Sequence, residues 1–447
     1  MRNLFGTDGI RGIANKYPMT TDTCFNLAKA LTTKFSNTNS LVIIGKDTRI
    51  SGSMFEHAFA SAFSSLGINV KLIGICPTPA ISILTKSMQA DFGIMISASH
   101  NPFADNGIKI FNNLGLKLTD QDEEQIENIM SQQNICDECN EYSEIIGEKI
   151  GSIEYSSENL QLYYIDKIKN SFSFDQTDTS KIKIALDLSN GSFSKIAPQL
   201  FRYFGFDIIS QYESPNGINI NEKCGVTNPQ TISDMTLTNN ADLGIAFDGD
   251  GDRLLMCDTH GRFLDGDHIL AILAESSDLL PTEIVSTIMS NFGFEQYLKK
   301  KNIKLIRTQV GDRYISEYML RSDSAFFGGE PSGHIIIKQH APTGDGLFAA
   351  LSVLNYLIKS GKKISDLYNI FKPYPVVSRN IKVSDKNILS KISSQINFYK
   401  NMLLNRGKLI VRASGTEPLI RISAEGEDQS ELESIVSDIA KIIQEAQ

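Results

Sequence analysis

The chain has 447 residues, a formal net charge of −9, 41% hydrophobic residues and 21% charged residues. This length predicts several domains, and the composition is typical of a globular protein rather than a disordered one. The acidic balance, without a cluster of lysine and arginine, argues against nucleic-acid binding. No apolar run is long enough to span a membrane, and the N-terminus lacks the apolar segment of a signal peptide, so a cytoplasmic location is expected.

The first 120 residues alternate strand and helix patterns. Short apolar runs predict strands at 41–44, 70–73 and 92–96. Between the first two runs, apolar residues recur at spacings of one, three and four over 54–66, which predicts a helix. This βαβ rhythm is typical of a mainly parallel sheet with helices on its faces.

The rhythm recurs twice further along the chain. The second set begins with a strand at 181–186 and ends with one at 243–247, and the third runs from 284–289 to 325–327. Each set closes with a strand that leads into a polar loop containing small residues, at 97–102, 248–253 and 328–334. Because ligands bind at the carboxyl ends of strands in open α/β sheets, these three loops are expected to line one cleft.

From about Tyr374 the pattern changes to strand, helix, strand and helix, with the loop 412–418 placed between strand and helix. Asp428 and Glu431 have capping-box spacing at the start of the last helix. Its apolar face consists of Leu432, Ile435, Val436, Ile439, Ile442 and Ile443. The predicted fold class is therefore α/β, with three similar α/β domains and a smaller α+β C-terminal domain.

The predicted domain boundaries follow these changes of pattern, with the polar segment 131–160 interpreted as a linker. The four ranges are 1–155, 156–255, 256–370 and 371–447. Six cysteines are scattered along the chain, and only Cys136 and Cys139 form a CxxC pair. Because no second pair completes a zinc site, ordinary reduced thiols are favoured over a metal or redox role.

Residues 248–253 read Asp-Gly-Asp-Gly-Asp-Arg and directly follow an apolar run. The carboxylates of Asp248, Asp250 and Asp252 repel one another unless a cation binds them, and the intervening glycines let the backbone fold around one centre. A calcium loop is excluded because Arg253 and Thr259 replace its required glycine and glutamate. An Mg²⁺ site is favoured over an exposed acidic turn, which makes phosphoryl chemistry a candidate function.

Ser99 follows the third predicted strand, in a Ser-Ala-Ser-His-Asn-Pro loop. Next to a metal site its hydroxyl is a candidate phosphoryl carrier, and a turn stabilised by polar side chains is the alternative. From the residues alone both stay open. The chain contains neither a Gly-x-Ser-x-Gly elbow nor a Walker A sequence, which disfavours acyl transfer and NTP-driven chemistry.

Two further groups of residues are candidates for substrate binding. An anion clamp is predicted at Arg412, Ser414, Gly415, Thr416 and Arg421, because backbone N–H groups, hydroxyls and guanidinium groups bind phosphate. A surface turn with incidental arginines is the alternative. A glycine-bounded loop that is suited either to sugar hydroxyls or to a solvated turn contains Glu330, Ser332 and His334. Lys109 is interpreted as a general base or as a charge at a strand edge.

These motifs, in this order, resemble those of the α-D-phosphohexomutase superfamily, and the resemblance covers essentially the whole chain. The motifs that carry it lie at 5–12, 45–51, 96–102, 248–253, 329–334 and 412–418. Residues 5–12, 219–225 and 343–346 are most similar to the bacterial branch that acts on glucosamine phosphates.

The resemblance implies four domains around a central cleft, with Ser99 as a phosphoserine. It assigns Mg²⁺ to Asp248, Asp250 and Asp252 together with a phosphoserine oxygen, and sugar hydroxyls to Glu330 and Ser332. The loop 412–421 would bind the phosphate that is not reacting. The residues assigned to the reacting centre are Arg11, His100, Lys109, Arg253 and His334.

The implied reaction interconverts glucosamine 6-phosphate and glucosamine 1-phosphate through a 1,6-bisphosphate, and feeds UDP-N-acetylglucosamine and peptidoglycan synthesis. A hexose 1,6-bisphosphate is implied as activator and intermediate, and a small phosphosugar is the expected partner. No nucleic-acid or membrane partner is expected, and a homodimer stays open.

Alternatives to this function are phosphomannomutase or phosphoglucomutase specificity and a non-catalytic sugar-phosphate sensor. Retention of Ser99, the three aspartates and the clamp disfavours the sensor. A phosphatase of the haloacid dehalogenase type is disfavoured because Asp252 stands where that motif needs threonine or valine.

Overall fold

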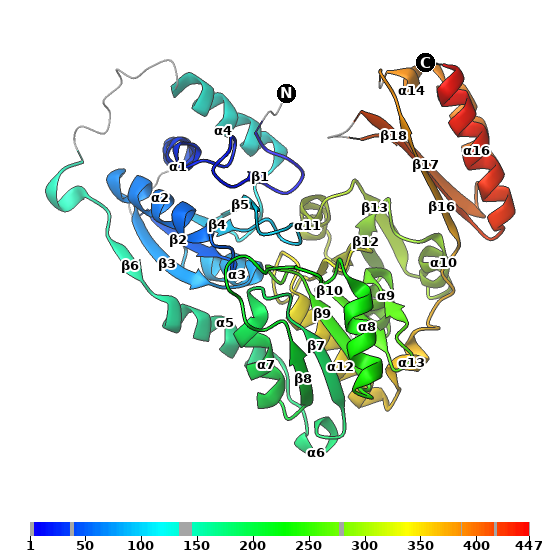
Figure 1. Cartoon of the computed structure of the whole chain (residues 1–447), viewed down its shortest axis with the longest axis horizontal. Coiled ribbons are helices and arrows are strands. Elements are labelled where there is room, and N and C mark those ends of the chain that lie inside the picture. Colours follow the sequence, from blue (N-terminus) through cyan, green and yellow to red (C-terminus); the bar gives the residue numbers. More distant parts are fainter. Residues whose placement is uncertain are drawn as a thin grey trace. The chain divides into compact units, whose positions relative to one another are not determined.

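Figure 1 shows the computed structural model of the chain, which describes residues 4–35, 40–133, 145–276, 281–385, 387–414 and 418–446. The chain packs as two compact units. The first comprises Met1–Met289 and Leu305–Ile370, and the second comprises Ser290–Lys304 and Phe371–Gln447. The structure contains four sheets, and each sheet with the helices that pack on it is called a domain below, numbered in chain order.

The first domain contains a six-stranded sheet in the order β1-β5-β4-β2-β3-β6. Its strands are β1 (Ile10–Ile13), β2 (Leu41–Lys46), β3 (Asn69–Ile75), β4 (Phe92–Ile96), β5 (Asp105–Asn112) and β6 (Ile153–Tyr155). Its helices are α1 (Thr21–Phe35), α2 (Gly52–Ser65), α3 (Thr78–Ser87) and α4 (Asp120–Gln133). The three predicted strands are confirmed as β2, β3 and β4, and β2 pairs in parallel with both others.

Helix α2 has the apolar face that the spacing predicted. Buried side chains on this face are Phe55, Ala58, Phe59, Ala62 and Phe63. They belong to one hydrophobic core with Val42 and Ile44 of β2. The helix is therefore stabilised mainly by burial of one stripe against the sheet.

The segment 131–160, which we predicted to be an irregular linker, contains regular elements in its described part. Helix α4 continues to Gln133, and β6 pairs in parallel with β3 at the edge of the first sheet. Helix α5 (Ser157–Ser171) follows directly. The prediction was wrong because β6 has only three exposed residues, Ile-Glu-Tyr, which is too short for a strand pattern. Residues 134–144, including the CxxC pair, lie outside the described residues.

The second domain contains a five-stranded sheet in the order β11-β10-β9-β7-β8. Its strands are β7 (Lys183–Asp187), β8 (Asp207–Gln211), β9 (Leu243–Phe247), β10 (Leu254–Asp258) and β11 (Phe263–Leu264). Helices α6 (Gln176–Thr179), α7 (Phe193–Tyr203) and α8 (Pro229–Thr238) follow the same alternation. The predicted strands at 181–186 and 243–247 are confirmed as β7 and β9, which pair in parallel.

The third domain contains a four-stranded sheet in the order β13-β12-β14-β15. Its strands are β12 (Glu283–Thr287), β13 (Lys304–Thr308), β14 (Ala325–Gly329) and β15 (Ile335–Ile337). Its helices are α9 (Gly266–Ser276), α11 (Asp312–Arg321), α12 (Gly346–Ser360) and α13 (Ile364–Leu367), whereas α10 (Phe292–Lys300) belongs to the second unit. The predicted strands at 284–289 and 325–327 are confirmed as β12 and β14, which pair in parallel.

The polar loop that closes each of these domains connects two antiparallel strands. One loop lies between β4 and β5, one between β9 and β10, and one between β14 and β15. The apolar runs did not indicate these returning strands, so the sheets are mixed rather than purely parallel. Because the second strand returns beside the first, a residue such as Lys109 on β5 lies close to the preceding loop.

The fourth domain contains an antiparallel sheet in the order β16-β18-β17. Its elements are β16 (Val376–Lys382), α14 (Ile388–Lys391), α15 (Ser393–Met402), β17 (Gly407–Ala413), β18 (Leu419–Gly426) and α16 (Gln429–Glu445). The loop predicted between strand and helix therefore lies between two strands, β17 and β18. That prediction missed β18, where buried Ile420, Ile422 and Ala424 alternate with Arg421, Ser423 and Glu425 at a period of two.

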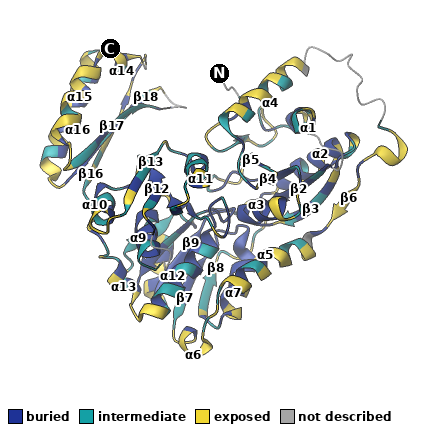
Figure 2. Ribbon diagram, turned by 180° about the vertical axis from the view of Figure 1, so that it is seen from behind, coloured by how far each residue is buried: buried dark blue, intermediate teal, exposed yellow. Residues whose placement is uncertain are grey.

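Helix α16 has the predicted buried face, and the Asp428 carboxylate accepts hydrogen bonds from the Ser430 and Glu431 N–H groups at its start. The Glu431 side chain pairs with Arg406 instead of completing a capping box. Figure 2 shows exposed residues along α4 and α16, whereas β4 and β9 are wholly buried. Among the described residues, no helix is long and apolar enough to cross a membrane.

Candidate active site

Ser99 lies in the loop after β4, and its backbone is held in an unusual conformation. Its φ angle is +54°, in the left-handed region that residues other than glycine rarely adopt. The Ser97 hydroxyl accepts a 2.8 Å hydrogen bond from the Ser99 N–H group. The Ser99 carbonyl oxygen accepts hydrogen bonds from Arg49 and Asn221. These contacts hold the buried hydroxyl in one direction, because both sides of its peptide are anchored.

The Ser99 hydroxyl donates a 2.5 Å hydrogen bond to Asp248, which follows β9 in the second domain. Asp248, Asp250 and Asp252 are buried, and each offers an oxygen within 4.8 Å of the others. A Cβ atom on Gly249 would lie 2.7 Å from the Ser99 carbonyl oxygen, so this close approach of the two loops requires glycine. The structure thus places the predicted metal ligands in contact with the predicted phosphoryl carrier.

The acidic loop fits a divalent cation in its donor atoms. The Oδ1 atoms of Asp250 and Asp252 are buried and have no hydrogen-bond partner within the described part of the chain. Burial, and then the charges of Asp252 and Asp250, hold the pKa of Asp248 well above its usual range. Oxygen ligands and local negative charge are what Mg²⁺ prefers, and a bound cation would satisfy both free oxygens. No other such cluster occurs among the residues that the structure describes.

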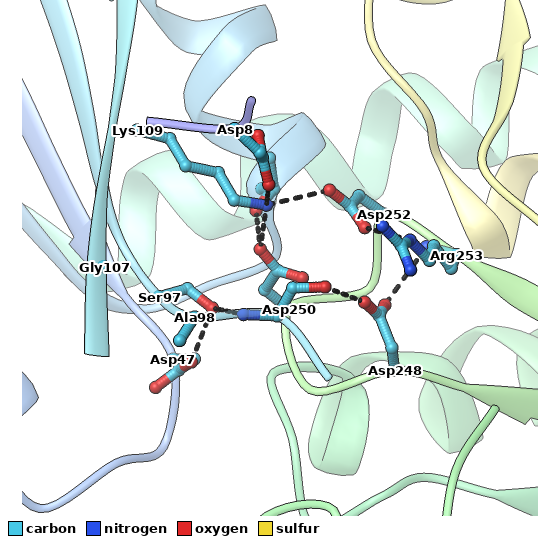
Figure 3. Close-up of polar contacts among 12 residues, drawn as sticks. Asp8, Asp47, Ser97, Ala98, Gly107, Lys109, Asp248, Asp250, Asp252 and Arg253 are labelled. Carbon is cyan, nitrogen blue, oxygen red and sulfur yellow. Dashed lines mark hydrogen bonds and ion pairs between the residues drawn. The ribbon is translucent and has the colours of Figure 1, made fainter. Parts of the chain in front are cut away.

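Lys109 projects from β5 into this cluster, as Figure 3 shows. Its Nζ atom lies 2.7 Å from Asp250, 2.9 Å from Asp252 and 3.3 Å from Asp8. Burial alone would lower the Lys109 pKa, but these carboxylates raise it well above its usual range. Lys109 is therefore an ammonium group at neutral pH, which suits charge neutralisation better than proton abstraction.

His100 and Arg253 border the serine on its other side. The Nδ1 atom of His100 lies 3.3 Å from Ser99 Oγ and 3.2 Å from Arg253 Nη1. Burial, and then the charges of Arg253 and Arg11, lower the His100 pKa to about 4, so the imidazole is neutral at pH 7. Arg11 pairs with Asp8 at 2.5 Å and donates to the Ala98 carbonyl oxygen.

Glu330 and His334 lie at the two ends of the turn between β14 and β15. The Glu330 carboxylate accepts a hydrogen bond of 3.2 Å from the Gly311 N–H group. His334 Nδ1 lies 3.7 Å from Asp252, which brings this loop against the acidic loop. Ser332, between them, is exposed. The three polar loops at 97–102, 248–253 and 328–334 therefore meet around one centre, as the βαβ pattern predicted.

Two carboxylates flank the His334 imidazole. Its Nε2 atom lies 3.2 Å from Asp312. The Gly344 N–H group also donates a hydrogen bond of 2.9 Å to Nε2, and this bond requires Nε2 to be unprotonated. Burial lowers the His334 pKa, but Asp312 and Asp252 more than offset this and raise it to about 10. We favour the protonated ring, because a buried imidazole between two carboxylates gains more from its charge than from one backbone donor.

The residues of the predicted anion clamp lie in the second unit. Arg412 on β17 is directly opposite Arg421 on β18 in the strand register. The Ser414 side chain is buried, and its N–H group donates to the Leu419 carbonyl oxygen. Like charges directly opposite one another destabilise a sheet, so this pair favours an anion ligand. Gly415 and Thr416 lie outside the described residues.

Several other polar or charged residues lie at this centre, and none of them was a candidate from the sequence. Asp8 and Asp47 belong to motifs that carried the resemblance. The Asp47 carboxylate accepts a hydrogen bond of 2.6 Å from the Ser97 hydroxyl. Thr78, at the start of α3, donates a hydrogen bond of 2.5 Å to Asp250. Lys117 and Asp312 pair with each other at 2.6 Å, and no local pattern marks either of them.

Comparison with known proteins identifies the family. Models of the phosphoglucomutase/phosphomannomutase family match the chain with alpha/beta/alpha domain I over residues 2–135, domain II over 163–261, domain III over 265–374 and the C-terminal domain over 380–442. The phosphoglucosamine mutase of Zymomonas mobilis subsp. mobilis is 42% identical over 453 residues, covering 100% of this chain and 99% of its own. That of Paramagnetospirillum magneticum is 41% identical over 456 residues, with the same coverage.

Solved structures share the fold at lower identity. A phosphoglucomutase/phosphomannomutase family protein from Burkholderia thailandensis superposes with a TM-score of 0.82 at 19% identity, covering 100% of this chain and 98% of its own. The N-acetylphosphoglucosamine mutase of Aspergillus fumigatus, in complex with GlcNAc-6P and magnesium, gives 0.64 at 17% identity over 100% and 96%.

The chain therefore belongs to the phosphoglucomutase/phosphomannomutase family of the α-D-phosphohexomutase superfamily. Its relatives at 41% and 42% identity, which match it over its full length, are phosphoglucosamine mutases, so the chain is an enzyme of the isomerase class. The four-domain α/β architecture expected from the sequence is confirmed.

Proposed function

We propose that this chain interconverts glucosamine 6-phosphate and glucosamine 1-phosphate. Ser99 would carry the phosphoryl group, and glucosamine 1,6-bisphosphate would be the intermediate. The product would supply UDP-N-acetylglucosamine for peptidoglycan synthesis. The observation that carries this proposal is the 2.5 Å contact between the buried Ser99 hydroxyl and the acidic loop, in a chain whose full-length relatives are phosphoglucosamine mutases.

The first transfer moves the phosphoryl group from phosphorylated Ser99 to the sugar O1 atom. The bond between Ser99 Oγ and phosphorus breaks as the bond between O1 and phosphorus forms. The proton that leaves O1 ends on Ser99 Oγ, and the neutral His100 imidazole, 3.3 Å from Oγ, is placed to pass it on. The second transfer is the same step with the sugar turned round, so that the 6-phosphoryl group returns to Ser99.

Charge neutralisation is the main contribution that this chemistry needs from the protein. Asp248, Asp250 and Asp252 would hold one Mg²⁺, which offsets the charge of the phosphoryl oxygens when bound. Lys109 and Arg253 add fixed positive charge on either side of Ser99. Arg11, anchored by Asp8, supports the same region.

Substrate recognition is divided between two loops in this proposal. Glu330 and Ser332 would contact sugar hydroxyls, since they lie on the turn that meets the acidic loop. His334, at the end of the same turn, lies 3.7 Å from Asp252 and would belong to the reacting centre. Arg412, Ser414, Gly415, Thr416 and Arg421 would bind the phosphate that is not reacting. The opposed arginines support this role, because a bound phosphate removes their repulsion.

The direct test follows phosphoryl transfer by ³¹P NMR. Purified protein with Mg²⁺ would be incubated with glucosamine 6-phosphate and a trace of hexose 1,6-bisphosphate, which primes Ser99. Glucose 6-phosphate and mannose 6-phosphate would be run in parallel, and intact mass would report phosphorylation. We expect the 1-phosphate of the amino sugar to form fastest.

The other possible results of this assay would contradict either the proposed substrate or the mutase activity itself. Preference for glucose or mannose phosphate would contradict the proposed substrate and retain the serine chemistry. No turnover of any sugar by protein with the phosphorylated mass would contradict mutase activity and favour a sugar-phosphate sensor.

A further inference from the structure

Six ionisable side chains form a closed ring of contacts beside the candidate active site. Each is in contact with the next, and the last is in contact with the first. In order around the ring they are Lys109, Asp252, His334, Asp312, Lys117 and Asp8. They come from three domains, so the ring exists only when these domains are packed together.

The inner half of the ring belongs to the centre already described. Lys109 lies 2.9 Å from Asp252, and Asp252 lies 3.7 Å from His334. All three side chains are nearly inaccessible to solvent. Their positions relative to Ser99 therefore determine the charge around the reacting phosphoryl group.

The outer half closes the ring through two residues that have had no role so far. Asp312, at the start of α11, lies 3.2 Å from His334 Nε2 and 2.6 Å from Lys117 Nζ. Lys117 also forms an ion pair with Asp8, which in turn lies 3.3 Å from Lys109. Lys117 and Asp312 are about nine-tenths inaccessible to solvent, so neither charge is well hydrated.

We infer that Lys117 and Asp312 are positioning residues for the reaction: their ion pair closes the ring and so holds His334 and Asp8 beside Asp252 and Lys109. This inference rests on the proposed function, because it takes Asp252, Lys109 and His334 as parts of the reacting centre. Asp8 lies between two lysines, and Asp312 lies between Lys117 and the His334 imidazole, so removal of one member leaves its two neighbours without a polar partner that they have in the ring.

A purely structural role is the competing explanation, and a neighbouring ion pair makes the two separable. Arg313, next to Asp312, pairs with Glu123 of α4 at 2.8 Å and with Asp120 at 2.6 Å. This pair also links α11 to the first domain and is similarly buried, but it lies outside the ring. If the ring only links domains, loss of either pair should have the same effect.

The test compares two double variants in which a buried ion pair becomes apolar. Lys117→Met with Asp312→Leu removes the outer half of the ring, and Arg313→Met with Glu123→Leu is the matched control. An apolar pair of similar volume commonly restores the stability that a single substitution loses, because no charge is left unpaired. We expect each single variant to melt lower than the wild type, and each double variant to melt closer to it.

Activity should separate the two double variants. We expect the ring variant to keep a kcat at least about tenfold below wild type although its Tm recovers, since supporting contacts typically contribute about 10–100-fold. The Mg²⁺ concentration at half-maximal thermal stabilisation should rise by about the same factor, because Asp252 loses its support. The control should retain both values within about threefold.

Recovery of kcat together with Tm in the ring variant would overturn the inference, as would an equal loss of kcat in the control. Failure of the proposed function is recognised separately, because the wild type itself would then not turn over glucosamine 6-phosphate. In that case the inference is tested by the Mg²⁺ concentrations at half-maximal thermal stabilisation of the two double variants. Equal concentrations would overturn it.

If the ring variant does not fold, Asp312→Asn replaces it, because this change keeps the shape and removes the charge. We expect its kcat, measured well below its Tm, to fall about tenfold or more. Wild-type kcat in this variant would overturn the inference.

Discussion

The Ser99 hydroxyl donates a hydrogen bond to the Asp248 carboxylate, although 149 residues separate the two in the chain. The contact joins a loop of the first domain to a loop of the second, and Gly249 allows the two backbones to approach. A candidate nucleophile therefore lies against a buried carboxylate cluster in the folded chain itself.

Ser99→Ala should abolish mutase turnover while the fold stays intact, because the variant lacks the oxygen that carries the phosphoryl group. ³¹P NMR measures turnover, and circular dichroism with thermal unfolding checks the fold. Ser87→Ala, at the end of α3, is the matched serine control and should retain wild-type activity. Full activity of Ser99→Ala with a normal spectrum would contradict the phosphoserine assignment.

Asp248→Asn should have opposite effects with and without Mg²⁺. In EDTA the variant should melt higher than the wild type, because without Mg²⁺ the wild type must either bury a third carboxylate charge or take up a proton at Asp248. With Mg²⁺ the wild type should gain stability as ligand binding favours the native state, and the variant should gain much less. Melting curves over a Mg²⁺ series measure both effects, and an equal gain in the two proteins would argue against the metal site.

Arg412→Ala should raise the KM for sugar phosphate about tenfold or more, because a hydrogen bond to a charged group contributes about 1.5–3 kcal/mol. Arg406→Ala is the control, because Arg406 pairs with Glu431 at the surface of the same domain. An unchanged KM for Arg412→Ala would count against the clamp.

Asp187 should make the stability depend on pH. Burial raises the pKa of this carboxyl at the end of β7 to about 6, although the Ser189 and Gly225 N–H groups donate to it. The folded chain then binds more protons than the unfolded chain between the two pKa values, so stability falls as pH rises through about 4 to 6.

Urea unfolding of the wild type and of Asp187→Asn measures this contribution, since other titrating groups cancel in the comparison. Relative to the variant, the wild type should lose about 2 kcal/mol between about pH 4.5 and 7.5. A stability difference that does not change with pH would show that Asp187 titrates normally.

Local patterns were enough to single out the acidic loop and the serine loop as candidates, because the residues of each loop are neighbours in the chain. Asp248, Asp250 and Asp252 occupy one short loop, and β9 before it is a plain apolar run. The prediction for the clamp loop was partly wrong, because β18 mixes buried Ile420 and Ile422 with charged residues and escaped recognition. The protonation state of Lys109 could not be predicted from its neighbours in the sequence, because it depends on carboxylates from another domain.

We could recognise the order of elements, the acidic loop and the family resemblance without a structure, since each depends on spacing between nearby residues. The packed chain was needed to show that Lys117 and Asp312 meet, that His334 lies between two carboxylates, and that carboxylates raise the pKa of Lys109. The physical reason is that a charge acquires its partners and its burial when distant segments pack, and neither is encoded in local periodicity.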